Sequence, residues 1–130
     1  MATIKAYTDI EQSKKLADIL PLESADMYWS TTLNTPVPYL ATKLEHQMYK
    51  EGANLIPCWS LAALLEQFPY ELCDDDGNSV YLEINKEDDL YQLVYTDPYE
   101  NFENVETDRC EHFVDACVAM IEKLNELNLL

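Results

Sequence analysis

The 130-residue chain is poor in glycine and in basic residues. Its two glycines, Gly52 and Gly77, cannot make a glycine-rich loop that cradles phosphate groups. Eight basic residues stand against 25 acidic ones, and the net charge of −17 repels nucleic-acid phosphate and anionic lipid surfaces. We therefore expect no direct binding to nucleic acids and no binding to membranes.

Long apolar runs and an export signal are lacking as well. The longest apolar-rich stretches, residues 61–65 and 113–121, are too short to span a bilayer. Residues 1–10 contain one lysine and lack the apolar segment of a signal peptide. These features predict a cytoplasmic protein.

The four cysteines, Cys58, Cys73, Cys110 and Cys117, form no CxxC pair and no closely spaced secreted-type framework. We interpret them as buried free thiols, which pack as small apolar groups. Cys110 and His112 are two residues apart on a predicted helix and point in different directions, so we expect no zinc site.

Apolar residues make up 48% of the chain, enough for the core of a single domain over residues 1–130. Their spacing predicts three main helices, at about residues 9–20, 57–68 and 108–127. Thr8 and Glu11 form a candidate capping box for the first, Pro57 suits the first turn of the second, and Asp108 is the candidate N-cap of the third. A further helix is expected near residues 39–50.

From Tyr70 onward the apolar period changes from 3.6 to 2, which is typical of strands. Residues 79–84 and 91–96 alternate, and we expect Leu82 and Ile84 to face the core. Gly77 marks one hairpin turn and residues 85–89 a second connection, with a short strand at residues 102–106. The predicted fold class is α+β, an antiparallel meander of about three strands packed against the three main helices.

Two features are candidate partner surfaces. One is the acidic block of residues 66–111, where 15 acidic residues stand against two basic ones; the other is the aromatic pair Tyr28 and Trp29, which forms a candidate cluster with Tyr39 and Tyr49. The alternatives are a solvated face that keeps the protein soluble, and ordinary core packing of the aromatic rings. The candidate residues are Asp74, Asp75, Asp76, Glu87, Asp88 and Asp89 in predicted turns, and the pair Tyr28 and Trp29.

A calcium loop is the only cofactor site that the acidic block suggests. Asp74, Asp76 and Glu83 match ligand positions of an EF-hand loop, but Leu72 at the first position offers no side-chain oxygen. Glu83 also falls in a strand pattern, where the motif requires a helix. We therefore expect a hairpin turn and no metal or other cofactor.

Three parts of the chain are familiar as sequence: residues 5–27, residues 56–65, and residues 114–124 with the ending 128–130. They resemble small uncharacterised proteins carried by phages and mobile elements of gut Bacteroidales. The resemblance covers about half of the chain and implies an origin in a bacterial accessory genome. It carries no activity, cofactor or site residue over to this chain.

Catalysis requires a nucleophile with a base or a pair of tuned acids, and the only histidines are His46 and His112. We do not expect an enzyme. The preferred hypothesis is a non-enzymatic protein-binding or regulatory accessory module of a bacterial mobile element. The alternative is an acidic DNA mimic that occupies a nucleic-acid-binding protein, and the second alternative is a small enzyme of unknown class.

Overall fold

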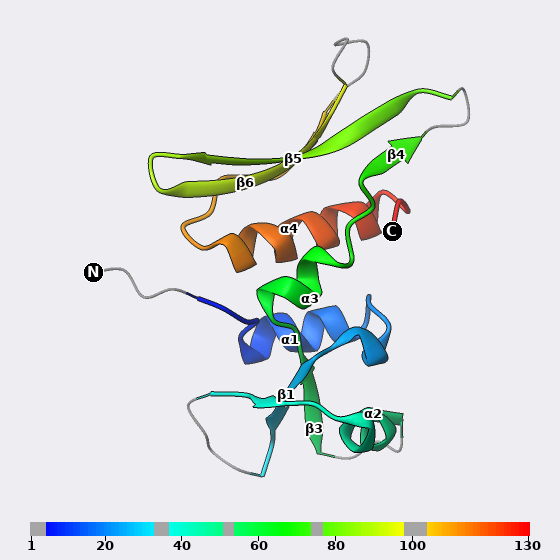
Figure 1. The fold of residues 1–130 in the computed structure, drawn as a ribbon, viewed down its shortest axis with the longest axis vertical. Helices are drawn as coiled ribbons and strands as arrows, with labels where there is room; N and C mark the ends of the chain where they lie inside the picture. The colour runs from blue at the N-terminus through cyan, green and yellow to red at the C-terminus, as the bar shows by residue number, and fades with distance from the viewer. Residues whose placement is uncertain (1–4, 33–36, 51–53, 74–76, 98–103) are drawn as a thin grey trace.

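The structure, a computed structural model, describes residues 5–32, 37–50, 54–73, 77–97 and 104–130. Its elements are stacked in layers along the long axis (Figure 1). A β-hairpin sheet lies at one end, helices α4, α3 and α1 follow, and a small sheet with helix α2 lies at the other end. The predicted α+β class is confirmed, because helices combine with two antiparallel sheets.

The first sheet is the predicted meander. Its strands pair in chain order and are β4 (Glu71–Cys73), β5 (Ser79–Glu87), β6 (Leu90–Thr96) and β7 (Val105–Glu106). β7 lies within the predicted residues 102–106. The second connection is shorter than predicted, because β5 continues to Glu87 and only Asp88 and Asp89 remain in the turn. Gly77 has the positive φ, 82°, that the predicted hairpin turn requires.

The second sheet was not predicted. Its strands are β1 (Met27–Ser30), β2 (Tyr39–Leu40) and β3 (Leu55–Cys58), in the order β2-β1-β3. β3 contains Pro57, so the prediction of a helix over 57–68 was wrong at its start. Proline is tolerated in a strand at the edge of a sheet, and β3 is such a strand. The helix that remains, α3 (Leu61–Leu65), begins after Ser60, whose hydroxyl accepts a hydrogen bond from the Ala63 amide.

The first helix, α1 (Ile10–Ala17), is shorter than the predicted 9–20 and begins one residue later than its capping box suggested. Asp9 is the N-cap: its Oδ1 accepts from the Gln12 amide at 2.8 Å, and Gln12 Oε1 accepts from the Asp9 amide at 3.1 Å. Thr8 is buried instead. Its hydroxyl lies 2.7 Å from that of Ser13 and accepts from the Trp59 amide.

Two more helices complete the fold. α2 (Lys43–Lys50) lies within the predicted 39–50, with η1, a short 3₁₀ turn at Leu22–Ser24, nearby. α4 (Phe113–Glu126) begins at N-cap His112, so the prediction that Asp108 caps it was wrong. The physical reason is a β-bridge: Cys110 exchanges two backbone hydrogen bonds, of 2.7 and 2.8 Å, with Tyr91, which holds this segment extended.

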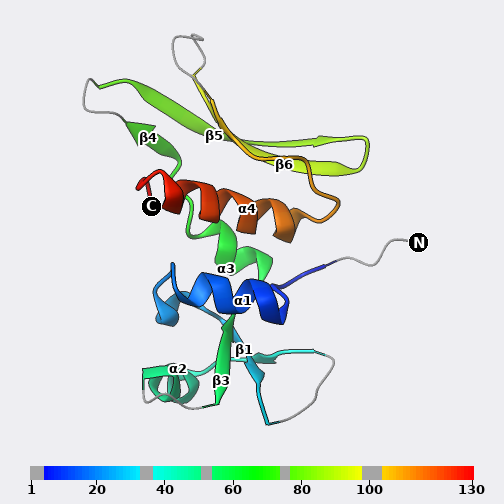
Figure 2. The same ribbon diagram turned by 180° about the vertical axis from the view of Figure 1, so that it is seen from behind.

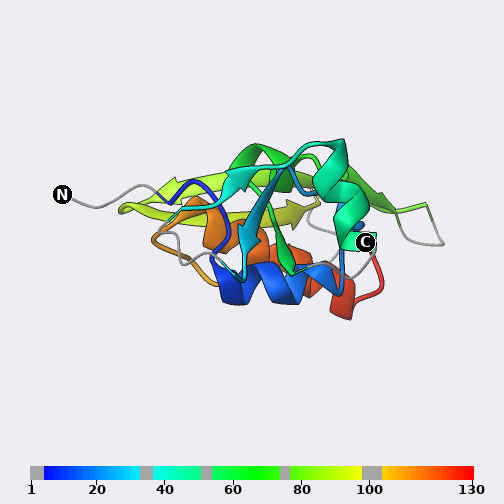
Figure 3. The same cartoon turned by 90° about the horizontal axis from the view of Figure 1, so that it is seen from below.

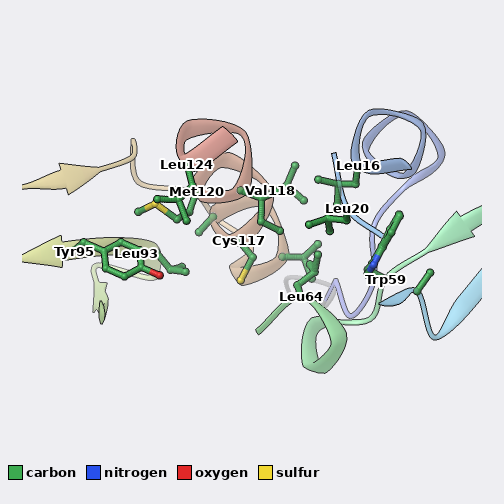
Figure 4. Packing of buried hydrophobic residues seen from close by; sticks show 14 residues of the cluster. Leu16, Leu20, Trp59, Leu64, Leu93, Tyr95, Cys117, Val118, Met120 and Leu124 are labelled. Atoms are coloured by element: carbon green, nitrogen blue, oxygen red, sulfur yellow. The ribbon is translucent and has the colours of Figure 1, made fainter. Parts of the chain in front are cut away.

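One apolar cluster connects the layers (Figure 4). Leu93 and Tyr95 of β6 pack against α4, and Leu64 of α3 joins α4 to α1. Because α4 packs against β6, the neighbouring part of β5 is left uncovered. Ile84 shares the core-facing side of the sheet with its cross-strand partner Leu93, as predicted, but Ile84 is 49% exposed whereas Leu93 is fully buried.

Helices α1 and α4 run in the same direction, as the view from behind (Figure 2) and the view from below (Figure 3) both show. The starts of the two helices therefore lie on the same side of the molecule. Among the described helices, none combines the length and apolar character needed to cross a membrane.

Candidate functional site

The β5–β6 hairpin places three of the predicted acidic residues at one tip. Glu87 pairs with Leu90, and the turn between them consists of Asp88 and Asp89 alone. Both turn residues have positive φ, 52° and 63°, as a type I′ turn requires. This turn matches the right-handed twist of the strands, and all three carboxylates are exposed.

The start of α4 lies beneath this tip. Tyr91 of β6 contacts Phe113, the first residue of α4, edge to face at 5.3 Å between ring centroids. On the same sheet face, Lys86 Nζ lies 5.3 Å from the Tyr91 ring centroid, a cation–π distance. Arg109 donates a hydrogen bond to Glu87 at 2.9 Å and ties the segment before α4 to the hairpin.

Lys5 connects the start of α1 to the start of α4. Its ammonium group donates to Asp115 at 2.7 Å and to Asp9 at 3.2 Å, while Gln12 Nε2 donates to Asp115 at 2.8 Å. Burial alone would raise the pKa of Asp115, but the hydrogen bonds from Lys5 and Gln12 outweigh it and lower this pKa. Burial would likewise lower the pKa of Lys5, but Asp115 and Asp9 raise it.

These elements enclose a hollow of about 620 Å³, which we call the hairpin hollow. Its lining combines four apolar or aromatic residues, which we call the floor, with three carboxylates, two ammonium groups and one imidazole. The floor residues are Leu61, Leu90, Tyr91 and Phe113; the acids are Asp88, Asp89 and Glu111; the others are Lys5, Lys86 and His112.

The aromatic pair lies at the other end of the molecule, in β1 (Figure 1). Trp29 is only 8% exposed; its indole N–H donates to the Thr8 carbonyl at 3.2 Å and its ring contacts Tyr7. The hypothesis that Trp29 belongs to a partner surface was therefore wrong, and the alternative, packing of its ring in the core, is correct. Tyr28 is half-buried against Tyr39, with ring centroids 5.5 Å apart.

The remaining predicted residues, Asp74, Asp75 and Asp76, lie outside the described residues. Glu83 lies in strand β5, where an EF-hand would require a helix. Within the described ranges, no three side chains of His, Cys, Asp or Glu gather closely enough to hold a metal ion.

The four thiols are free; burial was predicted correctly for Cys58 and Cys117, but Cys110 is only partly buried and Cys73 is exposed. Burial raises the pKa of Cys58 and raises the pKa of Cys117 to about 12. At neutral pH both are therefore protonated thiols, which are poor nucleophiles.

Among the residues that line the hairpin hollow, sequence patterns indicated only Asp88 and Asp89 as a partner surface. Lys5, Tyr91 and Phe113 belong to three segments that only the packing of the hairpin on α4 brings together. The one available signal was charge, because Lys5 and Lys86 are two of only eight basic residues.

Comparison with family models, with curated proteins and with solved structures finds no match.

Proposed function

We propose that the protein is a non-enzymatic, cytoplasmic module that binds a basic partner protein at the hairpin hollow. One observation carries the proposal: the exposed residues Asp88 and Asp89 line the same hollow as Glu111, 22 residues later in the chain, together with the apolar floor. Protein interfaces commonly combine such an apolar centre with a charged rim.

The chemistry of the hollow favours a cationic side chain from the partner. Lys86 of this chain already lies over the Tyr91 ring, so the three carboxylates of the hollow would supply the attraction for a partner cation. A partner arginine is suited to the same surroundings, because its planar guanidinium stacks on aromatic rings and pairs with two carboxylate oxygens at once.

A binding role also agrees with the lining groups. The described lining residues include no thiol and no serine or threonine hydroxyl that could act as a nucleophile. The amine of Lys5 is held by Asp115 and Asp9 and is protonated at neutral pH, since its pKa is raised. Charge on the rim mainly accelerates association and selects the partner, while burial of the floor supplies affinity.

A charge-matched pair of variants tests the proposal. The hollow variant combines Asp88→Asn, Asp89→Asn and Glu111→Gln, and asparagine tolerates the positive φ of the turn. The control variant replaces three exposed acids, in α1, at its C-cap and in η1: Glu11→Gln, Asp18→Asn and Glu23→Gln. Each variant removes three negative charges.

The probe is a fluorescent octa-arginine peptide, and binding is measured by anisotropy at several salt concentrations. We expect the hollow variant to lose about tenfold more affinity than the control, since each lost pair of exposed charges contributes on the order of 0.2–1 kcal/mol. Equal losses in the two variants would mean that only the net charge matters, and the hollow would not be the binding site.

The DNA-mimic alternative differs in its partner. In that case the bound protein would use its nucleic-acid-binding surface, and duplex DNA would compete with this chain for it. A basic partner that binds the hollow and duplex DNA simultaneously would exclude the alternative.

A further inference from the structure

One edge of the β5–β6 hairpin is closed and the other is open. The β6 edge is covered, because Tyr91 exchanges backbone hydrogen bonds with Cys110, and Val94 and Tyr95 pair with β7. β5, by contrast, pairs with β4 only at residues 79–81. Beyond Leu82, β5 has no second neighbouring strand among the described residues.

The register identifies the backbone groups on the open edge. In an antiparallel pair, successive residues point their N–H and C=O groups alternately toward and away from the partner strand. The Leu82 amide points away from β6, because it donates to the Tyr70 carbonyl at 3.0 Å. By alternation, the N–H and C=O groups of Ile84 and Lys86 point outward on the same edge.

The two faces beside this edge differ in chemistry. Ile84 is opposite buried Leu93, so its half-exposed side chain lies on the α4 side of the sheet, as does Lys86 opposite Tyr91. Glu83 and Glu87 alternate with them and lie on the outer face, where both are exposed. An added strand would therefore meet Ile84 and Lys86 on one face and carboxylates on the other.

We propose that a partner protein binds by adding an extended, basic segment as a strand to the open edge of β5. The segment alternates apolar residues, which face Ile84, with basic residues, which face Glu83 and Glu87. This inference rests on the proposed function and specifies its geometry, because Lys86 belongs to both the strand edge and the hairpin hollow.

Charge decides between a basic partner and a second copy of this chain. Exposed strand edges usually carry charges that prevent pairing with like edges. Two copies of a chain with net charge −17 would repel each other at such an edge. The same carboxylates attract a basic segment, so they exclude self-pairing and favour the proposed partner.

The test uses a fluorescent peptide of alternating lysine and valine residues and two N-methylated forms of it. One form is methylated at the valine amides and the other at the lysine amides. A residue that pairs with Ile84 through hydrogen bonds has its side chain on the same face as Ile84. The valine N–H groups should therefore point at β5 and the lysine N–H groups at solvent. All three peptides carry the same charge, so nonspecific attraction to the acidic chain is identical for them.

We expect methylation of the valine amides to weaken binding about tenfold or more, since several edge hydrogen bonds are lost, and methylation of the lysine amides to change it less than about twofold. Ile84→Pro, which removes an outward N–H and no hydrogen bond to β6, should weaken binding of the unmethylated peptide, while Ile84→Val should not.

Two outcomes would overturn the inference: no saturable binding of the alternating peptide, or equal effects of the two methylation patterns. Either result would leave the proposed function standing, because that proposal is tested separately by octa-arginine binding to the charge-matched hollow and control variants. If that comparison fails while the methylation patterns differ, the strand edge binds without the acidic rim and the proposed role of the hollow is wrong.

Discussion

The Lys5–Asp115 ion pair joins the start of α1 to the first turn of α4, across 110 positions of the chain. Asp115→Asn is the informative perturbation. It removes the negative charge but keeps the Oδ1 atom that accepts the 2.8 Å hydrogen bond from Gln12. The side chains of Lys5 and Asp115 are 21% and 31% exposed, so solvent partly screens the pair.

The expected cost follows from two interactions. A screened ion pair contributes about 0.2–1 kcal/mol. A carboxylate in the first turn of a helix adds about 0.3–1 kcal/mol through the helix dipole, and Asp115 has this position in α4. We therefore expect Asp115→Asn to lower the free energy of unfolding by about 1 kcal/mol at neutral pH.

The cost should depend on pH with a definite sign. The pKa of Asp115 is lowered from 3.8, so its contribution is present above about pH 4 and is lost as pH falls through the folded-state pKa. The pKa of Lys5 is raised from 10.5, so its contribution is present below that pH and is lost as pH rises through the folded-state pKa. Wild type and variant should therefore converge at both extremes.

Urea denaturation followed by tryptophan fluorescence measures this difference, because Trp29 and Trp59 are both buried. Lys5→Met and the double variant complete a thermodynamic cycle, in which the coupling energy should be about 0.2–1 kcal/mol and vanish at the pH extremes. A variant as stable as wild type at pH 7, or a difference that stays constant down to pH 2, would refute the reasoning.

Three other outcomes are expected. Asp9→Ala should lower the free energy of unfolding by about 1 kcal/mol, because the N-cap of α1 is lost. Thr8→Ala should lower it by about 1–3 kcal/mol, because buried hydrogen-bonding groups are left unpaired. The midpoints of urea denaturation measure both changes. Asp89→Gly should raise the melting temperature, since glycine adopts the 63° φ without a side-chain clash, and a lower value would contradict the type I′ turn. With a thiol-specific reagent at pH 8, Cys73 should react quickly and Cys58 only on unfolding; fast reaction of both would contradict the burial of Cys58.

The sequence by itself determined the elements whose apolar pattern is long enough to be unambiguous. α4 buries seven side chains at helical spacing, and β5 and β6 alternate on either side of a turn made only of acids. For such segments the period of the pattern and the period of the backbone coincide, so local sequence is sufficient to identify the element, although not where it begins and ends. The exposure of the acidic residues at the hairpin tip could likewise be predicted from the sequence.

The sheet of β1, β2 and β3 shows where local pattern fails. Its strands have two to four residues, too few to display a period, and β3 includes Pro57, which also suits the first turn of a helix. Pairing between β1 and β3, nearly thirty residues apart, decided in favour of strand. The same long-range pairing, of Cys110 with Tyr91, moved the start of α4 from Asp108 to Phe113.

The hairpin hollow and the open edge of β5 were decided by tertiary structure alone. α4 packs mainly on β6 rather than on the neighbouring β5, so it covers Leu93 and leaves Ile84 exposed, although both fit the same alternating pattern. Local alternation specifies which side chains share a face of a strand, and only the packing of another element specifies which part of that face is buried. The candidate site lies where that coverage ends.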